Sequence, residues 1–64
     1  MKETELWSRM QTHLGVAYAG VWAAEYSLAS LRGKTVQQAL ADGIPCKTIW
    51  RAVWEALALP DRER

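Results

Sequence analysis

The sequence predicts an all-α domain, a small compact bundle of three main helices plus one short helix. Apolar residues recur at the three- and four-residue spacing of helices over most of the chain. Isolated Gly and Pro residues divide the chain into stretches of helical length. The run Thr35-Val36-Gln37-Gln38 has the pattern of a capping box, which is the best local helix signal in the sequence.

The length of 64 residues provides one domain, residues 1–64, with a small core. A chain of this size buries only about 60% of the surface that it exposes when unfolded, so its stability depends on few large side chains. The four tryptophans bury the most area per residue. The predicted core consists of Trp7, Trp22, Leu28, Leu40, Ile49, Trp50 and Val53.

Two helices are predicted in the first half of the chain. The first covers residues 5–14, with Thr4 as its N-cap and Gly15 as its stop. The second covers residues 16–31 and carries a single charge, so we expect it to be the most buried helix. Gly20 lies in its middle, where Gly costs up to about 1 kcal/mol relative to Ala. Close approach of another helix would explain this glycine.

The third predicted helix is short and covers residues 35–42. Gly33 suits the left-handed conformation of the connector before it. The Thr35 hydroxyl accepts a hydrogen bond from the Gln38 amide, and the Gln38 side chain reaches back to the Thr35 amide. Gly43 then ends the helix.

The last helix should begin at Pro45 or Cys46, because proline suits a first helical position and disfavours helix before it. Pro60 ends it, and residues 61–64 form a solvated tail. Its apolar arc contains Cys46, Ile49, Trp50, Ala52, Val53, Ala56 and Leu57. Thr48, Arg51 and Glu55 should point outward.

The segment of residues 35–52 partly fits a helix-turn-helix unit, in which a short helix, a turn glycine and a longer helix follow one another. In this interpretation Lys47, Thr48 and Arg51 would face a DNA groove. Two expected core positions are polar, however, and Glu55 shares the outward face. The formal charge of only +1 also provides little attraction to phosphate. We therefore favour a helical corner that packs without DNA.

Trp54 lies at the edge of the apolar arc, beside Lys47, and one turn after Trp50. Trp50 faces nearer the centre of the arc and is predicted to be core. For Trp54 two interpretations are equally open: a core position, or an exposed anchor for a partner, since interface hot spots are rich in tryptophan. The candidate partner-binding residues are Lys47, Arg51 and Trp54.

No set of residues indicates catalysis, a cofactor or a metal. Glu25 is the one charge in an apolar helix, and we expect it to bond an indole N–H, a histidine or an arginine structurally rather than to act as an acid or base. His13 is the only histidine, and a dyad with Cys46 lacks a third orienting group. We expect no enzymatic activity.

The single Cys46 excludes an internal disulfide and favours a reducing compartment. The N-terminus has two acids where a signal peptide would have an apolar run, and no apolar stretch is long enough to span a membrane. We expect a soluble, cytoplasmic protein.

An ordered set of residues extends over nearly the whole chain: Thr4-Glu5, Trp7, Tyr18-Ala19, Leu31, Gly33, Thr35-Val36, Ala39-Leu40, Gly43 and Trp50-Arg51-Ala52-Val53. In this set the chain resembles a family of short actinobacterial proteins classified only as a domain of unknown function. The resemblance implies a small helical, cytoplasmic bacterial protein with no assigned activity. The chain departs from the family pattern at Pro45-Cys46, where Asp-Pro is expected, and at Trp54, where Cys is expected.

The leading hypothesis is a non-catalytic protein–protein interaction or regulatory module with an unidentified protein partner. The alternative is a DNA-binding module that reads through residues 46–55. Self-association through exposed aromatic residues is a third hypothesis. DNA binding should weaken as the salt concentration rises, and self-association should raise the solution mass as the protein concentration rises, so these two measurements separate the hypotheses.

Overall fold

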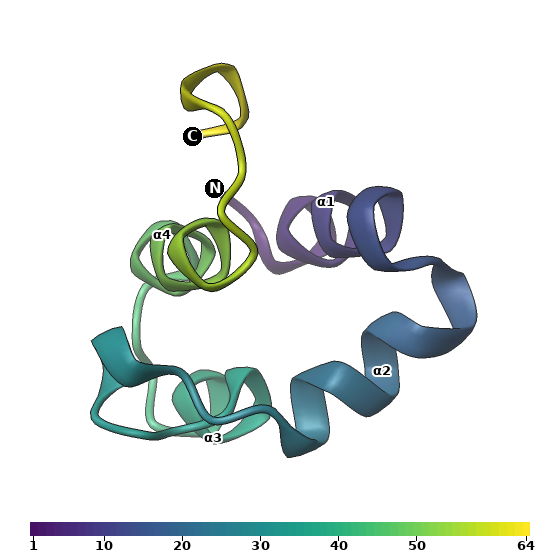
Figure 1. Cartoon of the computed structure of the whole chain (residues 1–64). Coiled ribbons are helices and arrows are strands. Elements are labelled where there is room, and N and C mark those ends of the chain that lie inside the picture. The colour runs from purple at the N-terminus through teal and green to yellow at the C-terminus, as the bar shows by residue number, and fades with distance from the viewer.

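The computed structural model describes residues 1–64, which form four α-helices and two short 3-10 turns (Figure 1). The elements are α1 (Glu3–Leu14), α2 (Val16–Glu25), α3 (Val36–Ala41) and α4 (Cys46–Ala56), with 3-10 turns at Ala29–Leu31 and Asp61–Glu63. A single antiparallel bridge joins Leu28 and Lys34. The all-α prediction is therefore confirmed.

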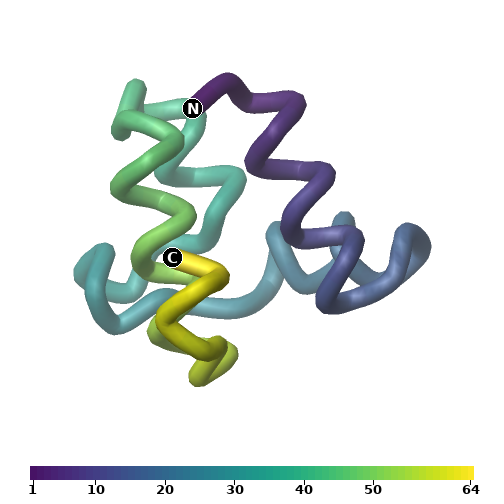
Figure 2. Tube along the Cα trace, turned by 90° about the horizontal axis from the view of Figure 1, so that it is seen from above, coloured from purple at the N-terminus to yellow at the C-terminus, as the bar shows by residue number.

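The four helices pack in a ring around one core. α1 contacts α2 and α4, and α3 closes the ring by contacting the same two helices (Figure 1). Seen from above, α1 and α4 run in the same direction (Figure 2). The molecule measures 25 × 25 × 21 Å, so every helix has one face on the core and another on the surface.

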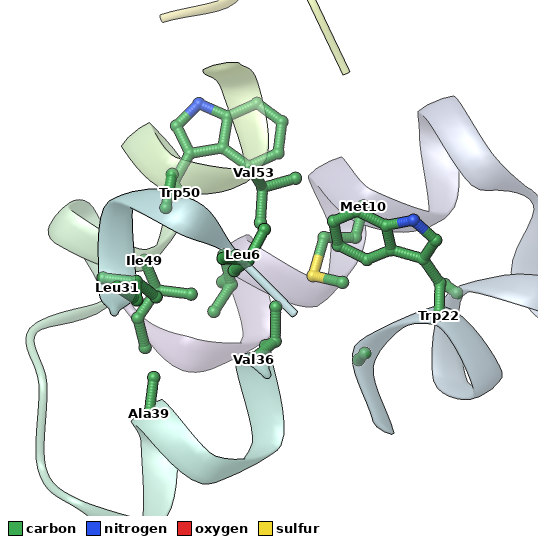
Figure 3. Packing of buried hydrophobic residues seen from close by; sticks show 13 residues of the cluster. Leu6, Met10, Trp22, Leu31, Val36, Ala39, Ile49, Trp50 and Val53 are labelled. Carbon is green, nitrogen blue, oxygen red and sulfur yellow. The ribbon is translucent and has the colours of Figure 1, made fainter. Parts of the chain in front are cut away.

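Thirteen buried hydrophobic residues form the core, and Figure 3 shows their side chains converging from all four helices. The predicted residues Trp22, Leu28, Ile49, Trp50 and Val53 belong to it. Trp7 and Leu40 do not, because each is only partly buried against the cluster. α1 instead contributes Leu6 and Met10 to the core, and both are fully buried.

The predicted start of α1 is wrong by two residues. The helix begins at Glu3 after Lys2, which provides no side-chain cap, so Thr4 lies inside the first turn rather than at the N-cap. Glu3 and Glu5 face the positive end of the helix dipole and stabilise the start instead. Gly15 ends α1 as predicted, with a φ of 87°.

The prediction of one helix over residues 16–31 is also wrong. α2 ends at Glu25, and Tyr26 is extended. Leu28 then donates its amide to the Lys34 carbonyl at 2.9 Å. This reversal brings Leu28 into the core and returns the chain toward α3, which a straight helix would have prevented.

α2 is not the most buried helix, although it is the most apolar. Only Ala19, Trp22 and Ala23 are buried on it, whereas Val16 and Tyr18 are 76% and 53% exposed. A chain of this length has one small core, which covers α2 from one side only. The apolar sequence of α2 alone therefore leads to an overestimate of how deeply this helix is buried.

No helix approaches Gly20, contrary to our expectation. A Cβ atom at this position would meet no atom within 4 Å, so the glycine faces open space. No contact within the folded chain therefore requires a glycine at this position.

The predicted third helix and its capping box are confirmed, with the helix ending at Ala41 rather than at Asp42. The Thr35 hydroxyl accepts from the Gln38 amide at 3.1 Å, and the Thr35 amide donates to the Gln38 side chain at 3.0 Å. Gly43 ends the helix in the left-handed conformation, with a φ of 78°. Because Thr35 is itself buried, this capping box fixes α3 to the core.

α4 begins at Cys46 as predicted but ends at Ala56, before Pro60. Ala58 adopts a φ of 52°, and the Leu59 amide bonds back to the Trp54 carbonyl at 3.1 Å. Alanine thus takes the left-handed position that usually holds glycine after a helix. This ending was missed because no glycine marks it.

Asp61, Arg62 and Arg64 are exposed, as expected of a solvated segment. Residues 61–64 are nevertheless not a free tail, because the C-terminal segment folds back over α4 on the side away from α3 (Figure 1). The indole nitrogen of Trp50 donates to the Glu63 carbonyl at 2.8 Å, and that of Trp54 donates to the Pro60 carbonyl at 2.8 Å. Indole N–H groups near a core require an acceptor, and this segment provides both.

None of the helices combines the length and the apolar character needed to cross a membrane.

Gly20→Ala should raise the free energy of unfolding by about 0.5–1 kcal/mol, because alanine favours helix and restricts the unfolded chain. Urea denaturation at low protein concentration measures the change. Gly43→Ala is the matched control, and it should destabilise the chain because Gly43 has a φ of 78°. A loss of stability in Gly20→Ala would show that another segment contacts this position.

Removal of residues 60–64 should lower the free energy of unfolding by about 1–3 kcal/mol, since both indoles lose their acceptors. Tryptophan emission should also shift to longer wavelength as Trp50 and Trp54 meet water. Arg62→Ala is the control, because the Arg62 side chain is exposed and bonds neither indole. Unchanged emission would contradict the docked segment.

Candidate functional site

A shallow open groove lies between α4 and the 3-10 turn at residues 29–31. Its volume is about 340 Å³. The lining residues are Ser30, Leu31, Lys47, Thr48, Arg51, Ala52 and Glu55. The groove contains two of the three predicted partner-binding residues, Lys47 and Arg51.

The orientation of α4 places these two cations in the groove. Ile49 and Val53 are completely buried and turn one side of α4 to the core. Residues three and four apart share a helix face, so Lys47 and Arg51 lie together on the opposite, exposed side. The outward orientation predicted for Thr48 and Glu55 is confirmed as well.

Lys47 and Arg51 belong to none of the ion pairs in the structure. These pairs are Arg9–Glu5, His13–Glu63, Lys34–Asp42 and Arg64–Asp61. The only acid in the groove, Glu55, accepts a hydrogen bond from the Ser30 hydroxyl at 2.6 Å. The groove therefore offers two unpaired cations beside a carboxylate that already has a partner.

A second hollow of about 290 Å³ continues the groove along the connector. Arg32 and Lys34 line it together with Thr48, which also belongs to the first groove. Lys34 is paired with Asp42, but Arg32 is exposed and forms no ion pair. Free cations thus lie on both sides of Thr48.

Trp54, the third predicted residue, does not line the groove. It is partly buried, its indole nitrogen bonds the Pro60 carbonyl, and the guanidinium of Arg64 lies 4.9 Å from the centre of its ring. A cation over an aromatic face is attractive at this distance. The C-terminal segment therefore already occupies much of the Trp54 ring.

Sequence reasoning missed Ser30 and Arg32. Residues 16–31 were predicted as one helix, which would have carried Ser30 away from α4. The reversal after Glu25 depends on the pairing of Leu28 with Lys34, and no local pattern announces it. The turn glycine at Gly33 was the one available signal.

The structure shows the surroundings of the three residues considered for catalysis, Glu25, His13 and Cys46. Glu25 is exposed and takes part in no side-chain hydrogen bond or ion pair, so the expected structural partner is absent. His13 Nε2 bonds Glu63 Oε1 at 2.8 Å and its ring stacks on Trp50, whereas Cys46 is a partly buried free thiol. No three His, Cys, Asp or Glu residues form a group that could hold a metal ion.

The predicted helix-turn-helix-like corner is formed by α3, the turn at Gly43 and α4 (Figure 1). Its outward residues Lys47, Thr48 and Arg51 are exposed, as such a unit requires. Glu55 is exposed on the same side. DNA binding by this corner stays a prediction.

No curated protein and no solved structure matches the chain significantly. A family model does match, and it covers residues 1–62, nearly the complete chain. Its description is "protein of unknown function (DUF3046)". The chain therefore belongs to this family, which confirms the resemblance seen in its sequence.

Proposed function

We propose that the chain is a non-catalytic interaction module that binds an acidic segment of a protein partner through the groove beside α4. The observation that carries the proposal is that Lys47 and Arg51 are exposed and belong to none of the ion pairs. Carboxylates of a partner can bond both cations without displacing an internal partner.

The shape of the groove supports a macromolecular partner. It is open along α4, and small or apolar side chains, Leu31 and Ala52, lie between the polar ones. Small-molecule sites are usually enclosed, whereas this groove is open to solvent. An extended segment can lie along it, with the hydroxyls of Ser30 and Thr48 available to its backbone.

The composition of the groove supports a non-catalytic role. No histidine or cysteine lines it. The Ser30 hydroxyl donates to Glu55 on the exposed surface, with no third group to orient the pair. Binding requires only the charges and hydroxyls that are present.

Trp54 has an indirect part in this proposal. It shares a sector of α4 with Lys47 and Arg51, but its ring is engaged by Pro60 and Arg64. We assign the main partner contacts to the two cations. Trp54 would contribute to partner binding only indirectly, by holding the C-terminal segment against α4.

DNA binding through residues 46–55 is the second candidate. The exposed Lys47, Thr48 and Arg51 on the second helix of a helix-turn-helix-like corner favour it. Glu55 on the same face and the total charge of +1 weigh against it. The two candidates use the same cations, so the salt dependence of duplex binding separates them.

The double variant Lys47→Glu/Arg51→Glu should retain a partner at least about tenfold more weakly, because it places like charges against an acidic segment. Affinity purification from the native cell with quantitative mass spectrometry measures the loss. Lys2→Glu/Arg62→Glu is the matched control, since it makes the same change of net charge at two exposed positions outside the groove.

Equal retention by the groove variant and the wild type would contradict the proposal. A gel shift with a random-sequence duplex at low salt forms the second arm. Duplex binding that weakens with salt and disappears in Lys47→Glu/Arg51→Glu would favour the DNA-binding alternative. Each variant is first checked by circular dichroism for retention of helix.

A further inference from the structure

Four large apolar or aromatic side chains are exposed on α2 and at Tyr26, which directly follows it. Val16, Tyr18, Val21 and Tyr26 are 76%, 53%, 50% and 45% exposed. With the terminal Met1 they account for all the exposed large hydrophobic residues of the chain. Contiguous exposed apolar faces on soluble domains usually mark contact sites.

Two alanines flank Val21 on the outer side of α2. Ala17, Val21 and Ala24 follow one another at helical spacing and lie on one line along α2, opposite the buried Ala19 and Ala23. All three central residues are exposed. A second helix can therefore approach the α2 backbone closely.

The two ends of α2 carry complementary charges that nothing in the chain satisfies. At the N-terminal end, Gly15 provides no side-chain cap and the first turn has no acid, so the amides of Val16 and Ala17 make no backbone hydrogen bond. The positive end of the helix dipole is thus open. At the other end, Glu25 is exposed and unpaired.

We propose that a second copy of the chain packs on this face, with the two α2 helices antiparallel about a two-fold axis between Gly20 and Val21. This arrangement places Glu25 of each copy beside the uncapped N-terminus of α2 in the other. An acid at a helix N-terminus is stabilising. The partner chosen is a second copy because one α2 helix supplies both halves of this charge complementarity.

The arrangement brings no like charges together. Residues 16–24 carry no charge at all, so the centre of the contact is neutral. The two Glu25 residues are separated by about 13 Å along the helix axis, given a rise of about 1.5 Å per residue. A hollow of about 210 Å³ adjoins the contact line and can receive a side chain of the second copy; it is lined by Tyr18, Val21, Trp22, Glu25 and Tyr26.

The proposed contact buries little surface, and this limits the affinity of the dimer. A helix of 10 residues covers far less than the roughly 800 Å² per partner of a stable dimer. Association is therefore weak and dependent on concentration. α2 also lies across the molecule from the 3-10 turn at residues 29–31, so the groove beside α4 stays open in the dimer (Figures 1 and 2).

Sedimentation equilibrium tests the self-association. The mean mass should rise from one chain toward two between about 10 µM and about 1 mM. Val21→Glu should weaken association at least about tenfold, because it sets two carboxylates against each other at the axis. Gln37→Glu on α3 is the control, with the same change of charge at another exposed helical position, and it should associate like the wild type. A mass of one chain at about 1 mM would overturn the proposal.

Disulfide trapping tests the orientation. In a Cys46→Ser background, Ala17→Cys should form mixed disulfides with Ala24→Cys in preference to either homodisulfide, since the antiparallel pairing puts these positions opposite each other. An excess of the mixed product over the statistical ratio supports the arrangement. A statistical ratio, or an excess of homodisulfides, overturns it.

Discussion

The indole of Trp50 joins three parts of this small molecule. It is 1% exposed, it stacks on His13 with ring centres 6.1 Å apart, and the Arg9 guanidinium lies 5.5 Å from its ring. Its nitrogen donates to the carbonyl of Glu63. α1, α4 and the C-terminal segment are thereby fixed to one ring. Together with the buried Ile49 and Val53, Trp50 turns one side of α4 to the core and leaves Lys47 and Arg51 on the other.

A second constraint is the limited core. Thirteen hydrophobic residues are buried, and α2 contributes only one of its sides to them. Stability therefore does not use the whole apolar surface of the chain, and the rest stays on the outside. The exposed face of α2 and the basic groove beside α4 are two surfaces of different chemistry, one apolar and one charged. The proposals of self-association and of partner binding arise from these two surfaces.

Features that depend on neighbouring residues could be predicted from the sequence. The capping box at Thr35, the left-handed Gly43 and the helix start after Pro45 each follow from bonds or steric limits within a few residues. The apolar arc of α4 likewise fixed its inward side, and with it the exposure of Lys47 and Arg51. The resemblance to the family was likewise visible in the sequence, and the family model confirms it over residues 1–62.

Features that depend on residues distant in the sequence could not be predicted. The reversal after Glu25 requires Leu28 to pair with Lys34, and the docking of the C-terminal segment requires the Trp50 and Trp54 indoles to find carbonyl acceptors. For the same reason Ser30 was not assigned to the groove. Composition also gives no measure of how much core is available, which is why the most apolar helix was expected to be the most buried.

Hydrogen exchange of the four indole N–H groups, followed by NMR, tests the central contact most directly. The Trp7 nitrogen bonds Glu3 on the exposed side of α1 at 3.3 Å and provides the internal reference. The Trp50 N–H should exchange the most slowly of the four, because it is buried and bonded to the Glu63 carbonyl at 2.8 Å. Exchange of Trp50 as fast as that of Trp7 would contradict the account.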